Sequence, residues 1–382
     1  MKIAFVNGYY LPAFDGPAQV THELASRYVK QGHEVHVFTS DLDKYKRLKP
    51  RELEIDCVKV HRCFTWGTLA NFSTIFPSVF FRLLKGNFDI IHTHVSGHMY
   101  HFLPALASRI KKIPHVHTTH CLGNSGKRSK FANFLVWIDY KTILPWSFKM
   151  TDKIIAITPW ELKYIQKFGG DSFKIRVIRN GVSGIFFKRI QPNQFKEKYH
   201  INGKIVLFFG RLDAIKGPEI LAEVGKQIVN ERDDVNFVFL GPDEGKKEEV
   251  KQIISGVDRM YLFDPIRDRE LIAEMYQAAD VYCLPSYREG LPLTLFEAMA
   301  AGLPIVASPV NGIPYEMKEP ENGFLVEYGD KKCLKKSILN ILDDEKLAKE
   351  MRKNNIEKAK RYNWDIIADE YMEVYKSLVK KK

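Results

Sequence analysis

Two glutamates in the stretch SYREGLPLTLFEAMAAGLPIVAS, residues 286–308, stand eight positions apart where a loop is expected to run into a helix. Glu289 precedes that helix and Glu297 lies inside it. The first N–H groups of a helix, here near Leu293 and Thr294, have no partner within the helix and attract anions. Two acids on either side of such a helix start can bind two sets of hydroxyls with a phosphate between them. The alternative is a solvated loop acid and an unrelated surface acid.

Two basic residues follow another expected strand, KIVLFF, in the turn GRLDAIKG at 210–217. Arg211 and Lys216 stand five positions apart in this turn, where a β–α crevice would hold a ligand. A planar guanidinium fork and a mobile ammonium together suit a diphosphate, which needs charge-assisted hydrogen bonds from two directions. Both could instead be solvated loop cations, but a later strand, DVYCL, is expected to deliver Glu289 to the same rim.

The opening turn YYLPAFDGPAQ, residues 9–19, offers a glycine close to a helix start. Gly16 permits close approach of a ligand to the backbone, and the helix that follows would present N–H groups to a phosphate. The turn is not G-x-G-x-x-G, so the dinucleotide-binding fingerprint is absent. An ordinary turn is the alternative interpretation.

Eleven of the 12 histidines lie within residues 1–182. Two pairs occupy matching faces of two expected strands, namely His92 with His94 and His115 with His117. No Asp or Glu lies within either cluster, and histidines between helices and a sheet are commonly hydrogen-bonded packing residues. We therefore expect packing and no metal site. His120 differs, because it falls past its strand in THCLGNSG, at the crevice edge where reacting groups are placed.

The scaffold for these residues follows from a repeated pattern of short apolar runs and helix-length amphipathic segments, which is typical of parallel βαβ units. The strands expected in the first series are 2–7, 34–39, 89–93, 114–119, 153–158 and 175–179. Those expected in the second series are 204–209, 235–240, 259–263, 280–284 and 304–307.

Two such series predict an α/β protein with two doubly wound, Rossmann-like domains. A chain of 382 residues is also too long for one ordinary core. The turn-rich segment 180–195 separates the series, so we expect domains at 1–182 and 183–364. Two similar domains facing one another create a cleft, and open α/β sheets bind ligands at the carboxyl ends of their strands.

The positive charge of the chain is concentrated in its first half. Residues 1–182 carry 26 Lys and Arg against 13 Asp and Glu, a net +13, whereas residues 183–382 carry 32 against 33, a net −1. A basic surface of this kind attracts nucleic acid, anionic lipid or a phosphorylated substrate. No nucleic-acid recognition motif accompanies the charge, so nucleic acid is not expected as a partner.

The five cysteines are odd in number and have no zinc-ligand spacing, which favours a reducing compartment. The chain begins with IAFVNGYY after Met1 and Lys2, which reads as a buried strand and not as a signal peptide. Two stretches of 19 residues without Asp, Glu, Lys or Arg, 63–81 and 90–108, are too polar to span a bilayer. A cytoplasmic location is expected.

Four features together resemble family 4 of the retaining, nucleotide-sugar-dependent glycosyltransferases, which have the GT-B fold. They are the run 286–308, the turn Gly-Arg-Leu-Asp-x-x-Lys-Gly at 210–217, the NGV at 180–182 and Trp364. The likeness covers essentially the whole chain, and the segment with two glutamates is its most specific part. It implies an acceptor-side first domain, a donor-binding second domain, and a last helix, within 365–382, that crosses back onto the first domain.

The resemblance implies a role for each candidate residue. Arg211 and Lys216 match the clamp on the donor diphosphate, and Glu297 matches the ligand of the nucleotide ribose. Glu289 matches the acid that contacts the transferred sugar, and His120 the histidine near the sugar and the acceptor. The remaining donor-binding positions are Gly16 in the first-domain loop, Ile266 in the segment DPIR whose backbone would meet the base, Gly290, Leu293 and Thr294.

The sequence departs from the family pattern at the first-domain loop, where Asp15-Gly16-Pro17 replaces a Gly-Gly pair. Pro17 has no N–H to donate, so one backbone contact with the phosphate is in doubt. In the implied mechanism the two cations and the helix start near Leu293 stabilise the departing nucleoside diphosphate, with no metal and no cofactor besides the nucleotide-sugar co-substrate. Domain closure would exclude water.

The expected function is the transfer of a sugar, with retention, from a nucleoside-diphosphate sugar to an acceptor such as a lipid-linked saccharide, a phospholipid or a cell-surface polysaccharide precursor. The alternatives are a glycosidase, a sugar-nucleotide epimerase of similar fold, and a non-catalytic protein that binds nucleotide sugars. Segments 127–149 and 62–85 mix basic and aromatic residues. They suggest a peripheral face for the anionic inner surface of the cell membrane, with ordinary helices covering the sheet as the alternative.

Overall fold

The structure is a computed structural model that describes residues 1–13, 15–43, 46–69, 73–122, 129–188 and 193–380. The chain forms two compact units. Unit 1 comprises Met1–Asn180 and Trp364–Lys382, and unit 2 comprises Gly181–Asn363. The division falls two residues before the boundary expected from the sequence, because Val182 makes a β-bridge with Asn363 and so belongs to unit 2.

Unit 1 is built on an eight-stranded sheet in which all neighbours are parallel except β5 and β6. In sheet order its strands are β12 (Ile175–Val177), β11 (Lys153–Ala156), β10 (His115–Thr118), β9 (Ile90–His94), β1 (Lys2–Val6), β2 (Glu34–Ser40), β6 (Val58–Cys63) and β5 (Glu52–Ile55). The six strands expected from the sequence are present. The hairpin of β5 and β6 was not expected, and it extends the sheet beyond β2.

The two faces of this sheet are covered by different helices. Ala4 and Val6 of β1 belong to a buried cluster that includes Val79 and Leu83, whereas Phe5 points to the opposite face and stacks on Tyr28. The helices of unit 1 are α1 (Gly16–Lys30), α2 (Ser78–Lys85), α3 (Phe102–Lys111), α4 (Lys130–Lys141), α5 (Ile143–Met150), α6 (Leu162–Lys167) and α15 (Trp364–Val379).

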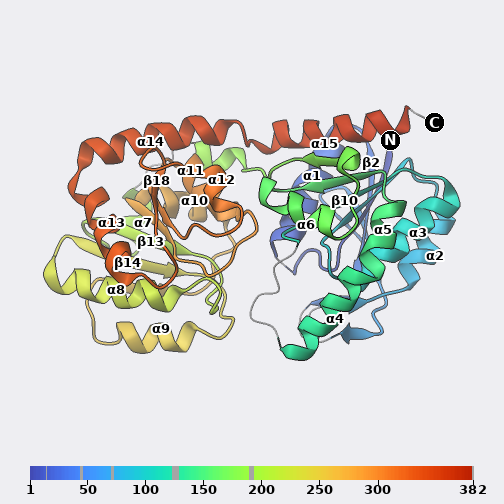
Figure 1. Ribbon diagram of the computed structural model, residues 1–382. Helices are drawn as coiled ribbons and strands as arrows, with labels where there is room; N and C mark the ends of the chain where they lie inside the picture. The colour runs from blue at the N-terminus through green and yellow to red at the C-terminus, as the bar shows by residue number, and fades with distance from the viewer. Residues whose placement is uncertain (14, 44–45, 70–72, 123–128, 189–192, 381–382) are drawn as a thin grey trace. The chain divides into compact units, whose positions relative to one another are not determined.

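Helix α15 completes the face that α1 covers, and the two helices lie side by side (Figure 1). The Tyr28 hydroxyl donates to the carbonyl of Ala368 at 2.8 Å, and the Tyr375 hydroxyl lies 2.6 Å from Nδ1 of His92 in the sheet. All of these side chains are buried. The last helix of the chain is therefore part of the core of unit 1.

Unit 2 has a six-stranded, all-parallel sheet. Its strands in sheet order are β15 (Met260–Phe263), β14 (Val235–Leu240), β13 (Lys204–Phe209), β16 (Val281–Leu284), β17 (Ile305–Ala307) and β18 (Gly323–Leu325). Its helices are α7 (Asn193–Lys198), α8 (Pro218–Glu231), α9 (Lys247–Ile254), α10 (Arg269–Ala278), α11 (Leu293–Ala300), α12 (Ile313–Glu316), α13 (Lys331–Asp343) and α14 (Glu345–Lys360).

Helical periodicity explains how α8 attaches to this sheet. Leu221, Val224 and Ile228 recur at helical spacing and are fully buried in one cluster with Val206 and Phe208 of β13. Burial of each such side chain contributes about 1.5–3 kcal/mol relative to exposure. Helices α9 and α13 contribute to the same cluster, so these three helices cover one face of the sheet.

Each sheet has a point at which the strand order reverses, between β1 and β9 in unit 1 and between β13 and β16 in unit 2. Open α/β sheets bind ligands beside the carboxyl ends of the strands at such points. The loops that follow β1, β9 and β10 lie at this edge of unit 1, and those that follow β13 to β17 lie at this edge of unit 2. The candidate residues are found on these loops.

Across the described ranges, no helix combines the length and apolar character that crossing a bilayer requires.

Candidate active site

The most direct contact among the candidate residues is an ion pair in unit 2. Nζ of Lys216, which follows β13, lies 2.5 Å from Oε1 of Glu289, which follows β16. The Ser286 hydroxyl donates to the same carboxylate oxygen at 2.7 Å. Glu289 is only 6% exposed, so it is not a solvated loop acid. A basic residue and a carboxylate from two neighbouring strands therefore meet at the reversal point of the sheet.

Arg211 extends this group toward β14. Its Nη1 donates to Glu244 at 2.6 Å, and its Nη2 lies 3.0 Å from Asp213. Burial of the guanidinium opposes its charge, but the two carboxylates outweigh that effect, and the pKa of Arg211 is raised. Arg211 therefore stays charged. Neither carboxylate partner was assigned a role from the sequence, although Asp213 lies within the same turn and Glu244 follows the Gly-Pro pair after β14.

The turn that carries Lys216 is fixed by contacts of its own. Asp213 accepts the backbone N–H groups of Ile215 and Lys216 at 2.9 Å each, and Ile215 accepts the N–H of Tyr287 at 2.7 Å. Gly217 has a φ of 65°, and a Cβ there would stand 2.4 Å from the carbonyl oxygen of Pro285. Only glycine fits this close crossing of the two loops. The distance between the two candidate loops is thus set by the backbone.

Glu297 lies on α11 and is 7% exposed, so the interpretation as a surface helix acid is also wrong. The buried hydroxyl of Tyr276 on α10 donates to its Oε2 at 3.2 Å. Burial and the nearby Glu297 carboxylate raise the pKa of Tyr276, so the phenol stays protonated and can donate. The carboxylate is therefore held by a neutral donor, and it keeps its capacity to accept further hydrogen bonds.

Helix α11 begins beside these acids. Leu293 and Thr294 are its first two residues, and, in the described part of the chain, no side chain caps the helix at Pro292. Its N-terminal N–H groups are suited to an anion. Gly290 lies just before this start, and its carbonyl accepts the N–H of Gly312 at 3.2 Å.

Ile266 occupies a separate position, because it is half-buried in the loop after β15, two strands from β13. Its loop belongs to the same carboxyl edge, where a ligand that extends past β14 would reach it. The unit 2 candidates therefore share one edge of one sheet, in the order Ile266, Arg211 with Lys216, and Glu289 with the α11 start.

In unit 1, the half-buried His120 follows β10, and its ring contacts that of the buried His94. Nε2 of His120 lies 2.9 Å from Nδ1 of His94. Burial lowers the pKa of His120 to about 3 and holds the pKa of His94 well below its usual value. Both rings are neutral at physiological pH, so one donates and the other accepts. Nδ1 is then the nitrogen through which His120 can meet a substrate.

The other strand histidines are packing residues with hydroxyl partners. Nε2 of His115 and Nδ1 of His117 lie 3.0 and 2.7 Å from the Thr93 hydroxyl, and Nε2 of His92 lies 2.8 Å from that of Thr118. Within the residues that the structure describes, no group of three or more His, Cys, Asp and Glu side chains is arranged to hold a metal ion.

Backbone strain marks the same edge of unit 1. Val95 after β9 has a φ of 72°, and the consecutive residues His120 and Cys121 after β10 have φ values of 51° and 70°. Left-handed backbone costs a non-glycine residue about 1–3 kcal/mol and tends to gather at functional sites. Histidine adopts this conformation more often than most residues, but valine and cysteine do not, so the residue types alone did not predict the turn. The strained turn is the feature of unit 1 that sequence reasoning missed.

A buried carboxylate holds this turn. Glu161, in the short helix η2 (Pro159–Glu161) after β11, has no exposed surface. Its Oε1 accepts the Thr119 hydroxyl and the Leu122 N–H at 2.8 Å each, and its Oε2 accepts the Ile157 N–H at 2.8 Å. Burial raises the pKa of Glu161 against these hydrogen bonds. Its partners bracket His120 on both sides.

Gly16 is the first residue of α1, whereas the sequence predicts a helix start near Pro17 or Ala18, one to two positions later. Its backbone is not left-handed, and a Cβ there would meet nothing within 4 Å, so the fold itself does not require glycine. Oδ1 of Asp15 caps the helix by accepting the N–H of Ala18 at 2.7 Å. With Pro17 lacking an N–H, the start of α1 already holds a carboxylate where a phosphate was expected to bind.

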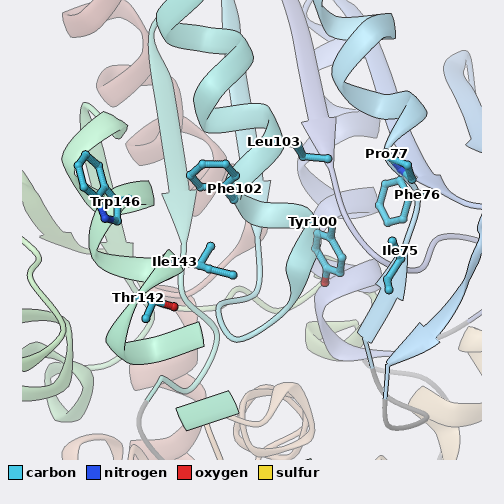
Figure 2. A pocket seen from close by; sticks show the side chains of 9 residues that line it. All are labelled: Ile75, Phe76, Pro77, Tyr100, Phe102, Leu103, Thr142, Ile143 and Trp146. Atoms are coloured by element: carbon cyan, nitrogen blue, oxygen red, sulfur yellow. The ribbon is translucent and has the colours of Figure 1, made fainter. Parts of the chain in front are cut away.

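A groove of about 580 Å³ opens in unit 1 on the face that α2, α3 and α5 cover (Figure 2). Its lining comes from β8 (Ser73–Ile75), the 3-10 helix η1 (Met99–His101), α3 and α5, and it is almost entirely hydrocarbon and aromatic. Trp146 at its border is 63% exposed. Further exposed aromatic side chains lie on the neighbouring α4, namely Phe131, Phe134 and Trp137.

The chain matches two protein-family models and is similar to solved structures. The Glycosyltransferase Family 4 model matches residues 14–183, and the model for Glycosyl transferases group 1 matches residues 189–358. HepE from Anabaena, solved in complex with UDP, superposes with a TM-score of 0.81 at 19% identity over 99% of this chain and all of that one. The fold, two Rossmann-like domains with parallel sheets, is that of the GT-B glycosyltransferases.

Two curated relatives are similar over most of their length. The D-inositol 3-phosphate glycosyltransferase of Acidothermus cellulolyticus is 27% identical over 94% of this chain and 84% of its own. The phosphatidyl-myo-inositol mannosyltransferase of Mycobacterium leprae is 27% identical over 78% of this chain and 75% of its own. The chain belongs to the group 1 glycosyltransferases, with a family 4 N-terminal domain, and is a glycosyltransferase.

Proposed function

We propose that the protein transfers a sugar, with retention of anomeric configuration, from a nucleoside-diphosphate sugar to a hydroxyl of an apolar or lipid-linked acceptor. The assignment of a nucleoside-diphosphate sugar as donor rests on the contact of Lys216 with Glu289, beside Arg211 and the start of α11. Cationic groups and a carboxylate at one sheet edge match a ligand with a diphosphate at one end and sugar hydroxyls at the other.

The diphosphate is assigned to Arg211, Lys216 and the N–H groups of Leu293 and Thr294. Departure of the nucleoside diphosphate concentrates negative charge on its terminal phosphate, and a fixed guanidinium, an ammonium and a helix N-terminus stabilise that charge without a metal. When the donor binds, the Lys216 ammonium must share its hydrogen bonds between Glu289 and the phosphate. Its three ammonium protons allow it to hold both.

The two carboxylates are assigned to different hydroxyls. Glu289, joined to Lys216, accepts from the transferred sugar next to the diphosphate, and Glu297 accepts from the ribose. The base extends toward the backbone at Ile266, and Gly290 lets the sugar approach the loop. The loops of Ile266 and Glu289 follow β15 and β16, with β14 and β13 between them, so the base and the transferred sugar are assigned to opposite ends of this row.

The unit 1 residues are assigned to the reacting face. His120, a neutral imidazole, accepts or donates a single hydrogen bond through Nδ1 to the sugar or the acceptor hydroxyl. Gly16 leaves open space at the start of α1, but the Asp15 cap reduces what that helix offers a phosphate. Retention rests on the family resemblance, in which the acceptor attacks on the face that the diphosphate leaves.

The donor assignment is tested by nucleoside diphosphate release from a panel of UDP-sugars and GDP-sugars, because HepE was solved with UDP and one relative is a mannosyltransferase. Thermal stabilisation by each sugar nucleotide is measured first, since a ligand that binds only the folded state raises the melting temperature. Release that depends on the acceptor supports transfer. Tight donor binding without release of nucleoside diphosphate, whichever acceptor is added, would contradict the transfer reaction and indicate a non-catalytic nucleotide-sugar-binding protein. A changed sugar that is still attached to its nucleotide would indicate an epimerase.

The acceptor assignment rests on the apolar groove of unit 1 and its surroundings. Nζ of Lys149 stands 5.2 Å from the centre of the Trp146 ring, and Arg109 donates to the Lys149 carbonyl at 3.1 Å. An exposed tryptophan with cationic neighbours at the mouth of an apolar groove suits a hydrocarbon chain with a phosphate head group. Each cation near an anionic surface adds about 1 kcal/mol of attraction. We assign the groove to the chain of an anionic acceptor lipid at a membrane surface.

Tryptophan quenching tests this assignment directly. Vesicles of phosphatidylglycerol brominated in the acyl chains should quench wild-type fluorescence more than those with unmodified chains, and Trp146→Phe should lose most of that difference. Leu103→Lys, which places a charge inside the groove, should abolish it. Phe173→Ala, which removes a 91% exposed aromatic that does not line the groove, is the matched control and should not change it. Equal quenching in wild type and Leu103→Lys would contradict a chain in the groove, and a water-soluble acceptor would then be sought.

A further inference from the structure

The turn that carries His120 is left-handed at two consecutive residues, and neither is a glycine. Such a turn persists only where its surroundings determine it. Backbone pairing supports it at Thr119, which donates its N–H to the Ile155 carbonyl of β11 at 3.0 Å. On the far side, the Leu122 N–H goes to a carboxylate. The conformation of the turn therefore depends on that side chain.

The carboxylate belongs to Glu161, and it links three segments. One oxygen holds Thr119 and Leu122, the residues that flank the left-handed pair, and the other holds the Ile157 N–H at the end of β11. Thr119, Leu122 and Ile157 all donate to it, and a carboxylate offers acceptors on both oxygens. An amide of the same size would turn an NH₂ group toward a donor. The site requires an anion and not merely a polar group of that length.

We propose that Glu161 is a positioning residue for the transfer reaction, because it fixes the left-handed turn at His120 and Cys121 and so sets where the His120 ring stands. This inference rests on the proposed function in so far as His120 acts on the substrate. Glu161 itself contacts the turn and β11, and it is assigned no contact with donor or acceptor. Its effect on catalysis passes through the turn.

The test measures the turn independently of turnover. The rate at which iodoacetamide alkylates Cys121 is followed by mass spectrometry, with the exposed Cys333 of unit 2 as the internal reference. Glu161→Gln should change the Cys121 rate at least threefold and lower kcat at least tenfold, while the KM for donor stays within twofold because the residues assigned to the diphosphate and the ribose belong to unit 2. The Cys333 rate should not change.

Milder variants keep the test valid if Glu161→Gln folds poorly. Thr119→Val removes one donor to the carboxylate and should change the alkylation rate of Cys121. Thr119→Ser keeps the hydroxyl donor and should give the wild-type alkylation rate. Glu23→Gln is the matched control, since Glu23 is another buried carboxylate of unit 1, paired with Arg27 on α1. It should lower stability without altering the Cys121 rate or kcat.

The outcomes separate this inference from the proposed function. A folded Glu161→Gln protein with wild-type Cys121 alkylation and wild-type kcat would overturn the role of Glu161. If Glu161→Gln shifts the Cys121 rate but His120→Ala leaves kcat unchanged, the turn is held as proposed and the assignment of His120 to the reaction is wrong. A loss of kcat in His120→Ala and Glu161→Gln alike, with the Cys121 shift, supports both.

Discussion

Nζ of Lys216 and Oε1 of Glu289 lie 2.5 Å apart although 73 residues separate them in the chain. Two neighbouring strands and a glycine crossing at Gly217 bring them together. The pair is nearly buried, so each charge depends on the other for its stability. In the proposed function the same contact places the phosphate-binding cation beside the sugar-binding acid, at the bond that breaks.

Removal of one charge of this pair should be costly. Lys216→Met leaves the Glu289 carboxylate buried without its cation, which we expect to lower the free energy of unfolding by about 3 kcal/mol. The double variant Lys216→Met with Glu289→Gln should recover most of this loss and remain inactive. Urea denaturation followed by circular dichroism measures both. A single variant as stable as wild type would show that the ion pair does not form in solution.

The two carboxylates should fail in different ways. Glu297→Ala removes the ribose contact, so the Kd for the nucleoside diphosphate should rise at least tenfold with little change in kcat. Glu289→Ala should lower kcat by a hundredfold or more with a smaller change in Kd, because its contact strengthens as the sugar departs. Calorimetric titration and steady-state kinetics separate the effects. Near-normal turnover in Glu289→Ala would remove its assigned role.

Arg211 provides a test of geometry as distinct from charge. Arg211→Lys keeps a cation but loses the planar fork that meets Glu244 and Asp213 together. We expect the Kd for the nucleoside diphosphate to rise about tenfold, which corresponds to about 1.4 kcal/mol. Lys226→Arg, a change at a cation of α8 outside the candidate site, should leave it unaltered. Equal affinity in wild type and Arg211→Lys would mean that only net charge matters there.

The buried histidines predict acid sensitivity. Burial depresses the folded-state pKa of His120 to about 3, and those of His92, His94, His115 and His117 are lowered as well. Below the unfolded value of 6.5 the unfolded chain binds protons that the folded chain does not, so stability is complete above that pH and falls as the pH drops toward 3. Each such histidine adds a slope of up to about 1.4 kcal/mol per pH unit.

Urea midpoints at pH 7.5 and pH 5.5 measure this effect, and the midpoint of the transition of unit 1 should be clearly lower at pH 5.5. His200 is the one histidine in the sequence of unit 2. Where the unfolding transitions of the two units are resolved, the midpoint of unit 2 should therefore shift less than that of unit 1. Turnover should show no titration of His120 between pH 5 and 8, because its ring stays neutral throughout. If the pH profile of turnover showed a pKa near 6.5, and His120→Ala abolished it, the ring of His120 would titrate in this range and would not stay neutral.

The strand pattern predicted most of the scaffold, because parallel strands covered on both faces are continuous apolar runs and are easily read. Strand β6 was not predicted because the exposed Lys59 and the half-buried His61 interrupt the apolar run, although they alternate with the buried Val58 and Val60 as in a strand with one buried face. The unit 2 candidates could be predicted because Arg211, Lys216, Glu289 and Glu297 directly follow or enter expected elements.

Glu161 could not be predicted in the same way. Nothing near it in sequence indicates that its partners are Thr119 and Leu122, about forty residues earlier, since that contact arises from the pairing of β10 with β11. Left-handed backbone at His120 and Cys121 could not be predicted either, because neither residue is a glycine and the enrichment of histidine in this region is a weak signal. Such features belong to tertiary context.

Helix α15 gives the chain an order of assembly. Tyr28 and His92 find their partners Ala368 and Tyr375 on a helix that follows all of unit 2 in the chain. Unit 2 is continuous in the chain, whereas unit 1, although most of it is synthesised first, lacks one layer of its core until α15 has been made. A nascent chain that stops before Trp364 therefore leaves Tyr28 and His92 without the partners that bury them in the complete unit 1.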